Sequence, residues 1–131
     1  MLALARRIAL LVVIALAGCP SKEPTIKKKP PPPAGVQTGY ATWYGGAHHG
    51  GPTASGEKYN KRAMTAAHRS LRMNTRVRVT NKRNGRSVIL RINDRGPYGN
   101  ASRIIDVSEV AAEQLGMIEA GVVPVVVEIV K

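Results

Sequence analysis

The chain has 131 residues and a formal net charge of +12, from 20 Lys and Arg against 8 Asp and Glu. A basic surplus of this size indicates an anionic partner, such as nucleic acid, anionic lipid or an acidic cell-wall polymer, without choosing among them. The single cysteine, Cys19, excludes a disulfide within the chain and a metal site built from several cysteines.

Residues 1–18 have the layout of a bacterial export signal. Arg6 and Arg7 precede an apolar run over residues 8–17, which is too short to span a bilayer as a mature helix. We therefore interpret the segment as a signal peptide that is removed. An uncleaved membrane anchor is the alternative.

The end of this segment, Leu16-Ala17-Gly18 followed by Cys19, resembles a bacterial lipobox. The resemblance implies that the cysteine thiol is lipidated and that cleavage leaves Cys19 as the acylated N-terminus. Pro20, rather than Asp, follows the cysteine. By resemblance to lipoprotein sorting rules, this predicts a lipid anchor in the outer membrane, facing the periplasm of the bacterial envelope.

Residues 19–37 are expected to form a linker between the lipid and a folded domain. The segment contains three lysines at 27–29, then four prolines at 30–33, and almost no apolar residues. Lysine repulsion and polyproline II geometry favour an extended chain of about 3 Å per residue where proline dominates. Such a linker would hold the domain on the order of 40–50 Å from a membrane.

Residues 38–131 have the length of one small domain with a single core. Residues 45–51 hold four glycines and are expected to be irregular. Pro124 should lie near the start of the last strand or on an edge. Runs of β-branched and aromatic residues predict strands over residues 40–44, 76–81, 87–93, 103–107 and 122–130.

A β-hairpin is predicted around Asn84-Gly85. Residues 76–81 alternate strictly, with Val77 and Val79 on one face and Arg76 and Arg78 on the other. Asn-Gly is typical of a two-residue hairpin turn, which would join this strand to the strand over residues 87–93.

Two short helices are also expected. Residues 61–67 have helical propensity, and Ser108 can cap a helix that runs through Leu115 and stops before Gly116. The buried side of that second helix would comprise Val110, Ala111, Gln114 and Leu115. With five or six short strands, a small closed or nearly closed barrel is the simplest architecture, because it leaves few unpaired strand edges.

Three titratable residues, Glu57, His68 and Asp94, are candidates for chemistry. Asp94 follows a run of β-formers and precedes Gly96, so a strand would deliver it to the rim of a core. Glycosidic cleavage requires a proton donor and a second group, and carboxylates in different environments supply both. On composition alone, a plainer interpretation is favoured: Asp94 caps a turn, Glu57 is a surface charge, and His68 is a loop histidine.

Seven motifs run through the domain in a characteristic order. They are G-Y-A-T-W-Y-G (39–45), H-G-G-P-T-A-S-G-E (49–57), A-M-T-A-A-H-R-S-L (63–71), V-R-V-T-N (77–81), N-G-R-S-V (84–88), I-N-D-R-G-P-Y (92–98) and R-I-I-D-V-S (103–108). In content, order and spacing they resemble the RlpA family of rare lipoproteins, which are septal lytic transglycosylases. The resemblance implies a mainly β fold over residues 38–131, a six-stranded double-psi β-barrel with one or two short helices.

The resemblance also implies the catalytic residues. Asp94 would be the acid/base that protonates the glycosidic oxygen, Glu57 the second carboxylate, and His68 a helper that tunes or orients it. In a lytic transglycosylase, the C6 hydroxyl of the N-acetylmuramyl residue attacks its own anomeric carbon, which gives a 1,6-anhydro end without water. The implied partner is the glycan strand of peptidoglycan. We expect a monomer that uses no cofactor and no metal.

Six further residues are candidates for binding the glycan. Aromatic faces pack on the C–H edges of pyranose rings, although core packing is the alternative for each aromatic residue. Tyr98 lies beside the Asp94 turn and so favours the site. The candidates are Trp43, Tyr44, Thr53, Tyr59, Arg95 and Tyr98.

Two other functions and a metal site are the alternatives to the enzyme. A non-catalytic wall-binding or wall-organising lipoprotein, similar to the barrels of expansins, is the main alternative. Nucleic-acid binding through Arg76, Arg78, Arg86 and Arg91 would explain the charge, but an export signal separates the chain from nucleic acid. His48 and His49 suggest a metal, yet neighbouring side chains on an extended chain point apart and only His68 remains as a further histidine.

Overall fold

A computed structural model describes residue 18 and residues 34–131 of the chain. The predicted signal peptide (apart from Gly18), Cys19 and most of the linker lie outside the described residues, and these assignments stay predictions. Among the residues that are described, no helix has the length and apolar character needed to cross a membrane.

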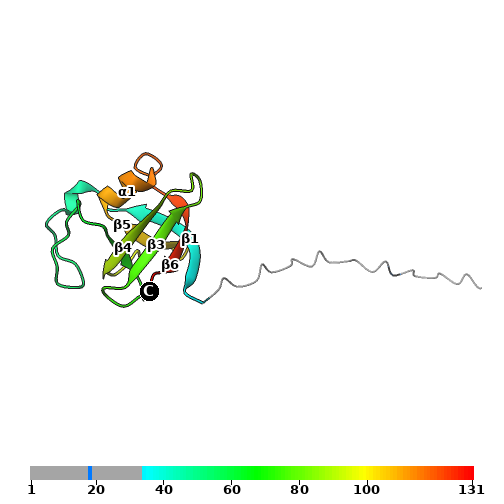
Figure 1. Cartoon of the computed structure of the whole chain (residues 1–131), viewed down its shortest axis with the longest axis horizontal. Coiled ribbons are helices and arrows are strands. Elements are labelled where there is room, and N and C mark those ends of the chain that lie inside the picture. The colour runs from blue at the N-terminus through cyan, green and yellow to red at the C-terminus, as the bar shows by residue number, and fades with distance from the viewer. Residues whose placement is uncertain (1–17, 19–33) are drawn as a thin grey trace, which may run out of the picture. The chain divides into compact units, whose positions relative to one another are not determined.

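Six strands close into a barrel, which confirms the predicted fold class (Figure 1). They are β1 (Val36–Trp43), β2 (Thr65–His68), β3 (Arg76–Asn81), β4 (Ser87–Asp94), β5 (Arg103–Val107) and β6 (Val123–Ile129). Around the barrel the order is β1-β5-β2-β4-β3-β6, in which β1–β5 and β2–β4 are parallel and the other pairs are antiparallel. A 3-10 helix (η1, Gly46–His48) and one α-helix (α1, Glu109–Leu115) complete the domain.

The core follows from alternation along the strands. Val77 and Val79 of β3 are fully buried, while Arg76 and Arg78, which alternate with them, are exposed, as predicted. The last strand, β6, also alternates, so it is buried on one face rather than on both. Pro124 is its second residue, near the start as predicted. The largest fully buried side chains are Leu90, Ile92, Ile105, Leu115, Met117, Val77, Val79, Val107, Val123, Val125, Val127 and Asn81.

The predicted helix over residues 61–67 is wrong. Thr65–His68 forms the short strand β2, and all four of its residues are buried between β4 and β5. Alanine has high helical propensity, but here pairing on both sides decides the conformation. The first strand also starts earlier than predicted, at Val36, because its first residues pair with β6.

The predicted hairpin is present, but its connection is longer than two residues. β3 ends at Asn81 and β4 begins at Ser87, with Gly85 at a φ of 76° within the loop. The side-chain amides of Asn81 and Asn84 both donate to the carbonyl oxygen of Leu115 at 2.9 Å. The loop is therefore fastened to the C-terminal end of α1, a contact that a two-residue turn would not make.

Helix α1 has nearly the predicted bounds. Ser108 occupies the N-cap position, although its hydroxyl makes no capping hydrogen bond, and Gly116 ends the helix with a left-handed φ of 67°. The predicted buried side is partly wrong, since Ala111 and Leu115 are buried but Gln114 is exposed. Ala112 is buried in its place.

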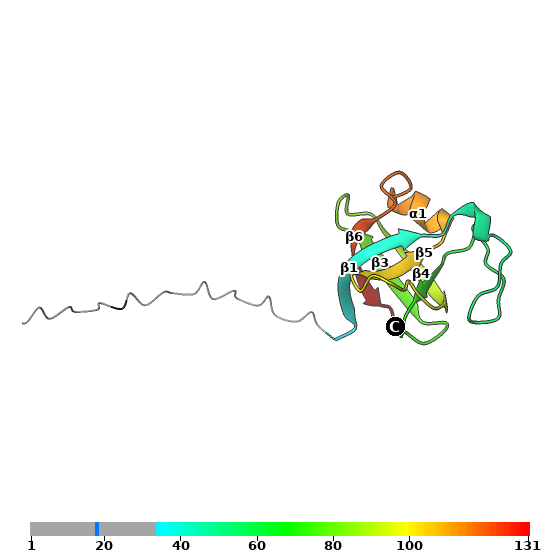
Figure 2. The same ribbon diagram turned by 180° about the vertical axis from the view of Figure 1, so that it is seen from behind.

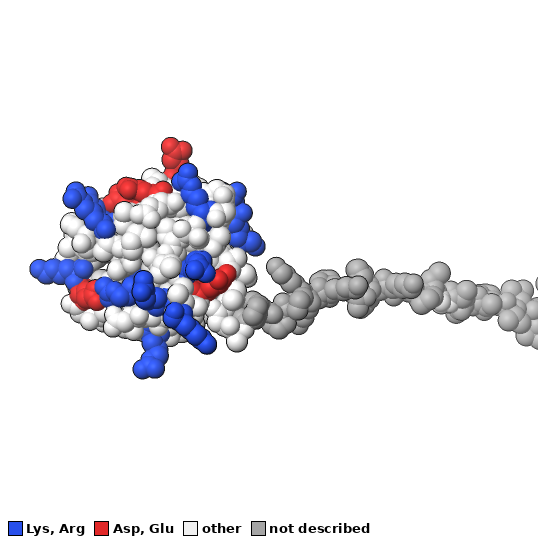
Figure 3. Space-filling model, in the orientation of Figure 1, with Lys and Arg blue, Asp and Glu red and all other residues white. Residues whose placement is uncertain are grey.

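The long connection between β1 and β2, residues 44–64, projects from one end of the barrel (Figure 2). Basic side chains are spread around the barrel on the face that Figure 3 shows, and are not gathered into one stripe. Two of the arginines that suggested nucleic acid contact carboxylates: Arg78 pairs with Glu128 at 3.7 Å and Arg91 with Glu57 at 2.6 Å.

Candidate active site

Asp94 stands at the end of β4, next to a β-bulge. In the β2–β4 pairing Ala66 faces Ile92 and Ala67 faces Asp94, so the register skips Asn93. An extra residue on one strand re-aims the side chains that follow it, and bulges of this kind occur often beside active sites. The bulge therefore determines the direction in which the Asp94 carboxylate points.

The half-buried Asp94 carboxylate accepts three hydrogen bonds. The backbone N–H groups of Ala54 and Arg95 donate to Oδ1 at 2.9 and 2.8 Å, and the Tyr44 hydroxyl donates to Oδ2 at 3.1 Å. Two of these donors, Tyr44 and Ala54, come from the β1–β2 connection, and the third is the residue that follows β4. Their convergence fixes the carboxylate in one orientation.

A pocket of about 210 Å³ opens beside this carboxylate. Its lining comprises Tyr44, Ala47, His48, Gly51, Pro52, Tyr59 and Asp94. The Tyr44 ring packs against Tyr59, with ring centroids 4.9 Å apart, and against the edge of His48 at 6.0 Å. We call this space the Asp94 pocket, since it is lined by one carboxylate and by a wall of aromatic side chains.

Burial raises the pKa of Tyr44, and the nearby carboxylates of Asp106 and Asp94 raise it further. The hydroxyl therefore keeps its proton and serves as a permanent hydrogen-bond donor to Asp94. Burial also raises the pKa of Tyr59, which is only 5% exposed and whose hydroxyl accepts from the Glu109 N–H at 3.1 Å. Both predicted tyrosines thus line the pocket, but each also holds part of its wall in place.

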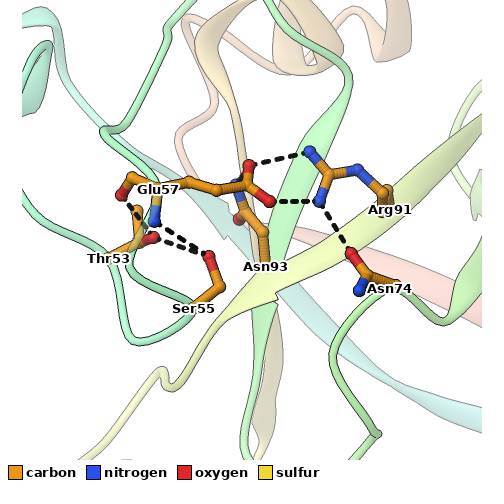
Figure 4. Close-up of polar contacts among 6 residues, drawn as sticks. All are labelled: Thr53, Ser55, Glu57, Asn74, Arg91 and Asn93. Atoms are coloured by element: carbon orange, nitrogen blue, oxygen red, sulfur yellow. Dashed lines mark hydrogen bonds and ion pairs between the residues drawn. The ribbon is translucent and has the colours of Figure 1, made fainter.

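Glu57 lies on the loop 53–57 and turns toward the outer side of β4 (Figure 4). The Arg91 guanidinium donates to both carboxylate oxygens, at 2.6 and 2.8 Å, and Asn93 Nδ2 approaches at 3.5 Å. The hydrogen bonds from Arg91 hold the pKa of Glu57 below its usual range. The exposed Glu57 is therefore an ionised carboxylate, which suits it to a role other than proton donor.

The loop that carries Glu57 also supplies a donor to Asp94. Besides the Ala54 N–H on Asp94, the Ser55 N–H donates to the Asn93 carbonyl at 3.2 Å. Thr53 closes the loop by donating to the Glu57 carbonyl at 2.6 Å (Figure 4). The two predicted carboxylates therefore lie at the same end of the barrel, Asp94 in the pocket and Glu57 on the flank of the loop that covers it.

His68 is not brought together with the carboxylates. It follows Ala67 on β2, and successive residues of a strand point to opposite faces. Its ring is 4% exposed, and Nε2 contacts Gln37 Oε1 at 2.8 Å beside a separate pocket of about 170 Å³. Within residues 34–131 no hydrogen bond joins this ring to Glu57 or Asp94.

The hydrogen bonds of His68 define its protonation. Nδ1 accepts from the backbone N–H groups of Ser70 and Leu71, both at 3.1 Å, so the proton resides on Nε2 and the ring is neutral. Burial lowers the pKa of His68, and the charges of Arg95 and Arg69 lower it further. The ring thus stabilises the turn after β2.

That turn binds the arginine next to Asp94. One nitrogen of the Arg95 guanidinium donates to the carbonyls of His68 and Leu71 at 3.1 and 2.6 Å. The Arg95 side chain, predicted to bind substrate, is therefore engaged with the backbone. Any influence of His68 on Asp94 runs through this turn and Arg95 rather than through direct contact.

The other predicted binding residues differ in exposure. Trp43 is half-buried and packs against the core, whereas Tyr98 is 73% exposed and free to meet a ligand. Thr53 is buried in the loop. His49 accepts from the Lys61 N–H at 3.2 Å, and no group of three or more His, Cys, Asp or Glu in the described part of the chain is placed to hold a metal.

A family described as "Lytic transglycolase" matches residues 36–127. The chain belongs to this family. The resemblance to RlpA is confirmed by endolytic peptidoglycan transglycosylases RlpA from Neisseria meningitidis serogroup B (53% identical over 93 residues) and Campylobacter jejuni (52% over 92), and by a probable one from Nostoc sp. (59% over 93). These alignments cover 71%, 70% and 70% of this chain, but only 38%, 33% and 25% of the respective relatives.

Solved structures share the barrel. The Streptomyces papain inhibitor superimposes with a TM-score of 0.58 at 23% identity, covering 73% of this chain and 94% of the inhibitor. An apo expansin from Clavibacter michiganensis superimposes with a TM-score of 0.57 at 24% identity, covering 73% and 50%. At such identity the likeness concerns the fold. The lytic transglycolase family therefore rests on the sequence match, and the double-psi barrel on both comparisons.

Proposed function

We propose that this chain is a peptidoglycan lytic transglycosylase that cleaves the glycan backbone and leaves 1,6-anhydro-N-acetylmuramyl ends. The observation that carries the proposal is the Asp94 carboxylate, aimed by a β-bulge into a pocket with an aromatic wall and fixed by three donors. The names of the relatives support the substrate and the reaction class, while the chain spans 25–38% of the length of the three relatives described.

The reaction balances with one acid/base. The C6 hydroxyl oxygen of the N-acetylmuramyl residue bonds to its own C1 as the bond from C1 to O4 of the next sugar breaks. Asp94 gives its proton to the departing O4 and takes the proton released by the C6 hydroxyl, so the enzyme returns to its initial state. No water is consumed, and the atoms of the substrate are divided between the two products.

Glu57 and His68 are proposed to assist Asp94 indirectly. Glu57, ionised on Arg91, holds the loop whose Ala54 N–H binds Asp94. His68 shapes the turn that binds Arg95. Tyr44, Tyr59 and the exposed Tyr98 are proposed to contact the sugars.

The test is product analysis with purified chain and peptide-free glycan strands. We expect 1,6-anhydro products from the parent, and a loss of roughly 10²–10⁴-fold in Asp94→Asn, the usual range for removing a general acid/base. Glu119→Gln, which neutralises an exposed carboxylate outside the site, should retain parental activity. Reducing-end products would refute the intramolecular route. Binding without any product would make the chain a wall-binding module of the expansin type.

We further propose that the chain is attached to the outer membrane, facing the periplasm, by a lipid on Cys19. The support is the lipobox-like sequence ahead of the only cysteine. In bacteria that express the full chain, Cys19→Ser should abolish incorporation of labelled palmitate and release the protein from the membrane fraction. Unchanged labelling would refute the anchor.

A further inference from the structure

A second aspartate, Asp106 of β5, lies in the same row of the sheet as Asp94. Strand β2 runs between β4 and β5, and Ala67 of β2 pairs with Asp94 on one side and with Asp106 on the other. Residues in register on adjacent strands point to the same face of a sheet. Two strand spacings of about 4.8 Å place the two backbones roughly 10 Å apart, with Ala67 as the residue in register between them.

The row continues onto β1. Thr42 pairs with Asp106, and the Thr42 hydroxyl donates to Asp106 Oδ1 at 3.2 Å. The β1–β5 register also skips a residue, since Tyr40 faces Arg103 and Ala41 faces Ile105. A bulge at Ile104 therefore re-aims Asp106, as the bulge at Asn93 re-aims Asp94. The barrel thus aims two carboxyl groups by the same device, one from each parallel pair of strands.

The surroundings of Asp106 are those of the Asp94 pocket. The charged and titratable groups near it are His48 of η1, Asp94 of β4, Arg103 of its own strand, and the hydroxyls of Tyr44 and Tyr59. Four of these five residues, all except Arg103, line the pocket. Asp106 is half-buried and does not itself line the Asp94 pocket.

We propose that Asp106 is the second carboxyl group of the Asp94 site, a positioning residue whose charge, set by the pH, acts on the Asp94 carboxyl group and so makes the activity depend on pH. It acts through the field across Ala67 and through Tyr44, which Asp94 and Asp106 both influence. The inference rests on the proposed transglycosylase function for its kinetic consequence. That the two carboxyl groups lie close enough to influence each other follows from the sheet register and does not depend on the reaction.

The ionisation of Asp106 falls in the range where such control is effective. The pKa of Asp106 is raised to about 6, chiefly by burial and to a smaller extent by the charge of Asp94, while the hydrogen bond from Thr42 and the nearby His48 and Arg103 oppose the rise. Below that pH Asp106 is neutral, and above it a second negative charge lies beside Asp94. Because repulsion between two carboxyl groups is mutual, the charge that Asp106 gains on losing its proton acts on the Asp94 carboxyl group across Ala67.

The kinetic test compares pH profiles of kcat/KM for anhydro-product formation by the full-length chain in detergent. The parent should show an inflection near pH 6, and Asp106→Asn should lack it. Thr42→Val keeps the carboxyl group but removes the hydrogen bond that lowers its pKa, so its inflection should move to higher pH. Glu119→Gln should reproduce the parent. A residue with a purely structural role would change the rate without moving the inflection.

A second measurement does not depend on activity. In a ¹³C-carboxyl NMR titration of the same protein, the Asp106 transition should move to lower pH by roughly 0.5 pH unit in Asp94→Asn, because a like charge has been removed. An Asp106 transition that Asp94→Asn leaves unchanged, or an inflection that survives in Asp106→Asn, overturns the inference. A parent without products but with the coupled titration would refute the proposed reaction and keep the two-carboxyl site.

Discussion

Replacing Tyr44 by Phe tests whether the donors around Asp94 are needed for activity. The substitution removes one hydroxyl, which donates to Asp94 Oδ2 at 3.1 Å, and leaves the ring packed between Tyr59 and His48. A hydrogen bond to a charged group contributes about 1.5–3 kcal/mol, and the length of this one indicates the lower end of that range. Each 1.4 kcal/mol corresponds to a factor of ten, so kcat/KM should fall about tenfold.

The assay is the rate of anhydro-product release from glycan strands by chromatography. Tyr40→Phe is the matched control, because Tyr40 is an exposed tyrosine on β1 that does not line the Asp94 pocket. We expect Tyr40→Phe to equal the parent and both variants to retain the parental circular-dichroism spectrum. Parental activity in Tyr44→Phe, or an equal loss in Tyr40→Phe, would refute the assignment of Tyr44 as a positioning donor.

Three further predictions concern stability. Burial lowers the pKa of His68 in the folded protein below its value of 6.5 in the unfolded chain, so the free energy of unfolding should decrease as pH falls below 6.5. Urea titrations from pH 7.5 to 5 measure this decrease. A free energy of unfolding that stays constant across that range would contradict a buried neutral ring. The Glu57 carboxylate, whose pKa in the folded protein lies below its ordinary value of 4.5, stabilises the fold above that pH, and the stabilisation is lost as pH falls. Glu57→Gln should therefore make the melting temperature depend less on pH between pH 3 and 5 than it does in the parent. In Gly116→Ala, a Cβ at a φ of 67° would lie 2.9 Å from Asn84 Nδ2, so a loss of about 1 kcal/mol or more is expected in chemical denaturation; parental stability would show that the helix end can relax.

Much of the fold was predictable where the pattern is local. The alternation of Val77 and Val79 with arginines specifies a strand with one buried face, and Gly116 marks the end of α1. The strand β2 was not predictable in this way, because Thr65–His68 is short and its two alanines favour a helix. Only its position between β4 and β5 makes it a strand.

In the site, too, some residues are recognisable from local motifs and others only from contacts between distant parts of the chain. Asp94 and Glu57 are recognisable from local motifs, because Glu57 follows Gly56 and Asp94 ends a run of β-formers two residues before Gly96. The orientation of His68 depends on β2 being a strand, which turns Ala67 and His68 to opposite faces. Asp106 lies within the R-I-I-D-V-S motif, but its hydrogen-bond partner Thr42 is 64 residues away in the chain, so no local pattern connects it with the site. A run of β-formers ending in Asp, common to Asp94 and Asp106, is the signal that would have identified it.

The skipped position at Asn93 has a consequence for engineering. What the carboxyl group of Asp94 faces is decided by how many residues precede it along the strand, since the side-chain period of a strand is two. Deleting Asn93, the extra residue of the bulge, is expected to turn the Asp94 side chain away from the Asp94 pocket, while the carboxyl group itself is retained. If Asp94 is the acid/base proposed above, deletion of Asn93 is expected to abolish activity although the acid itself is unchanged.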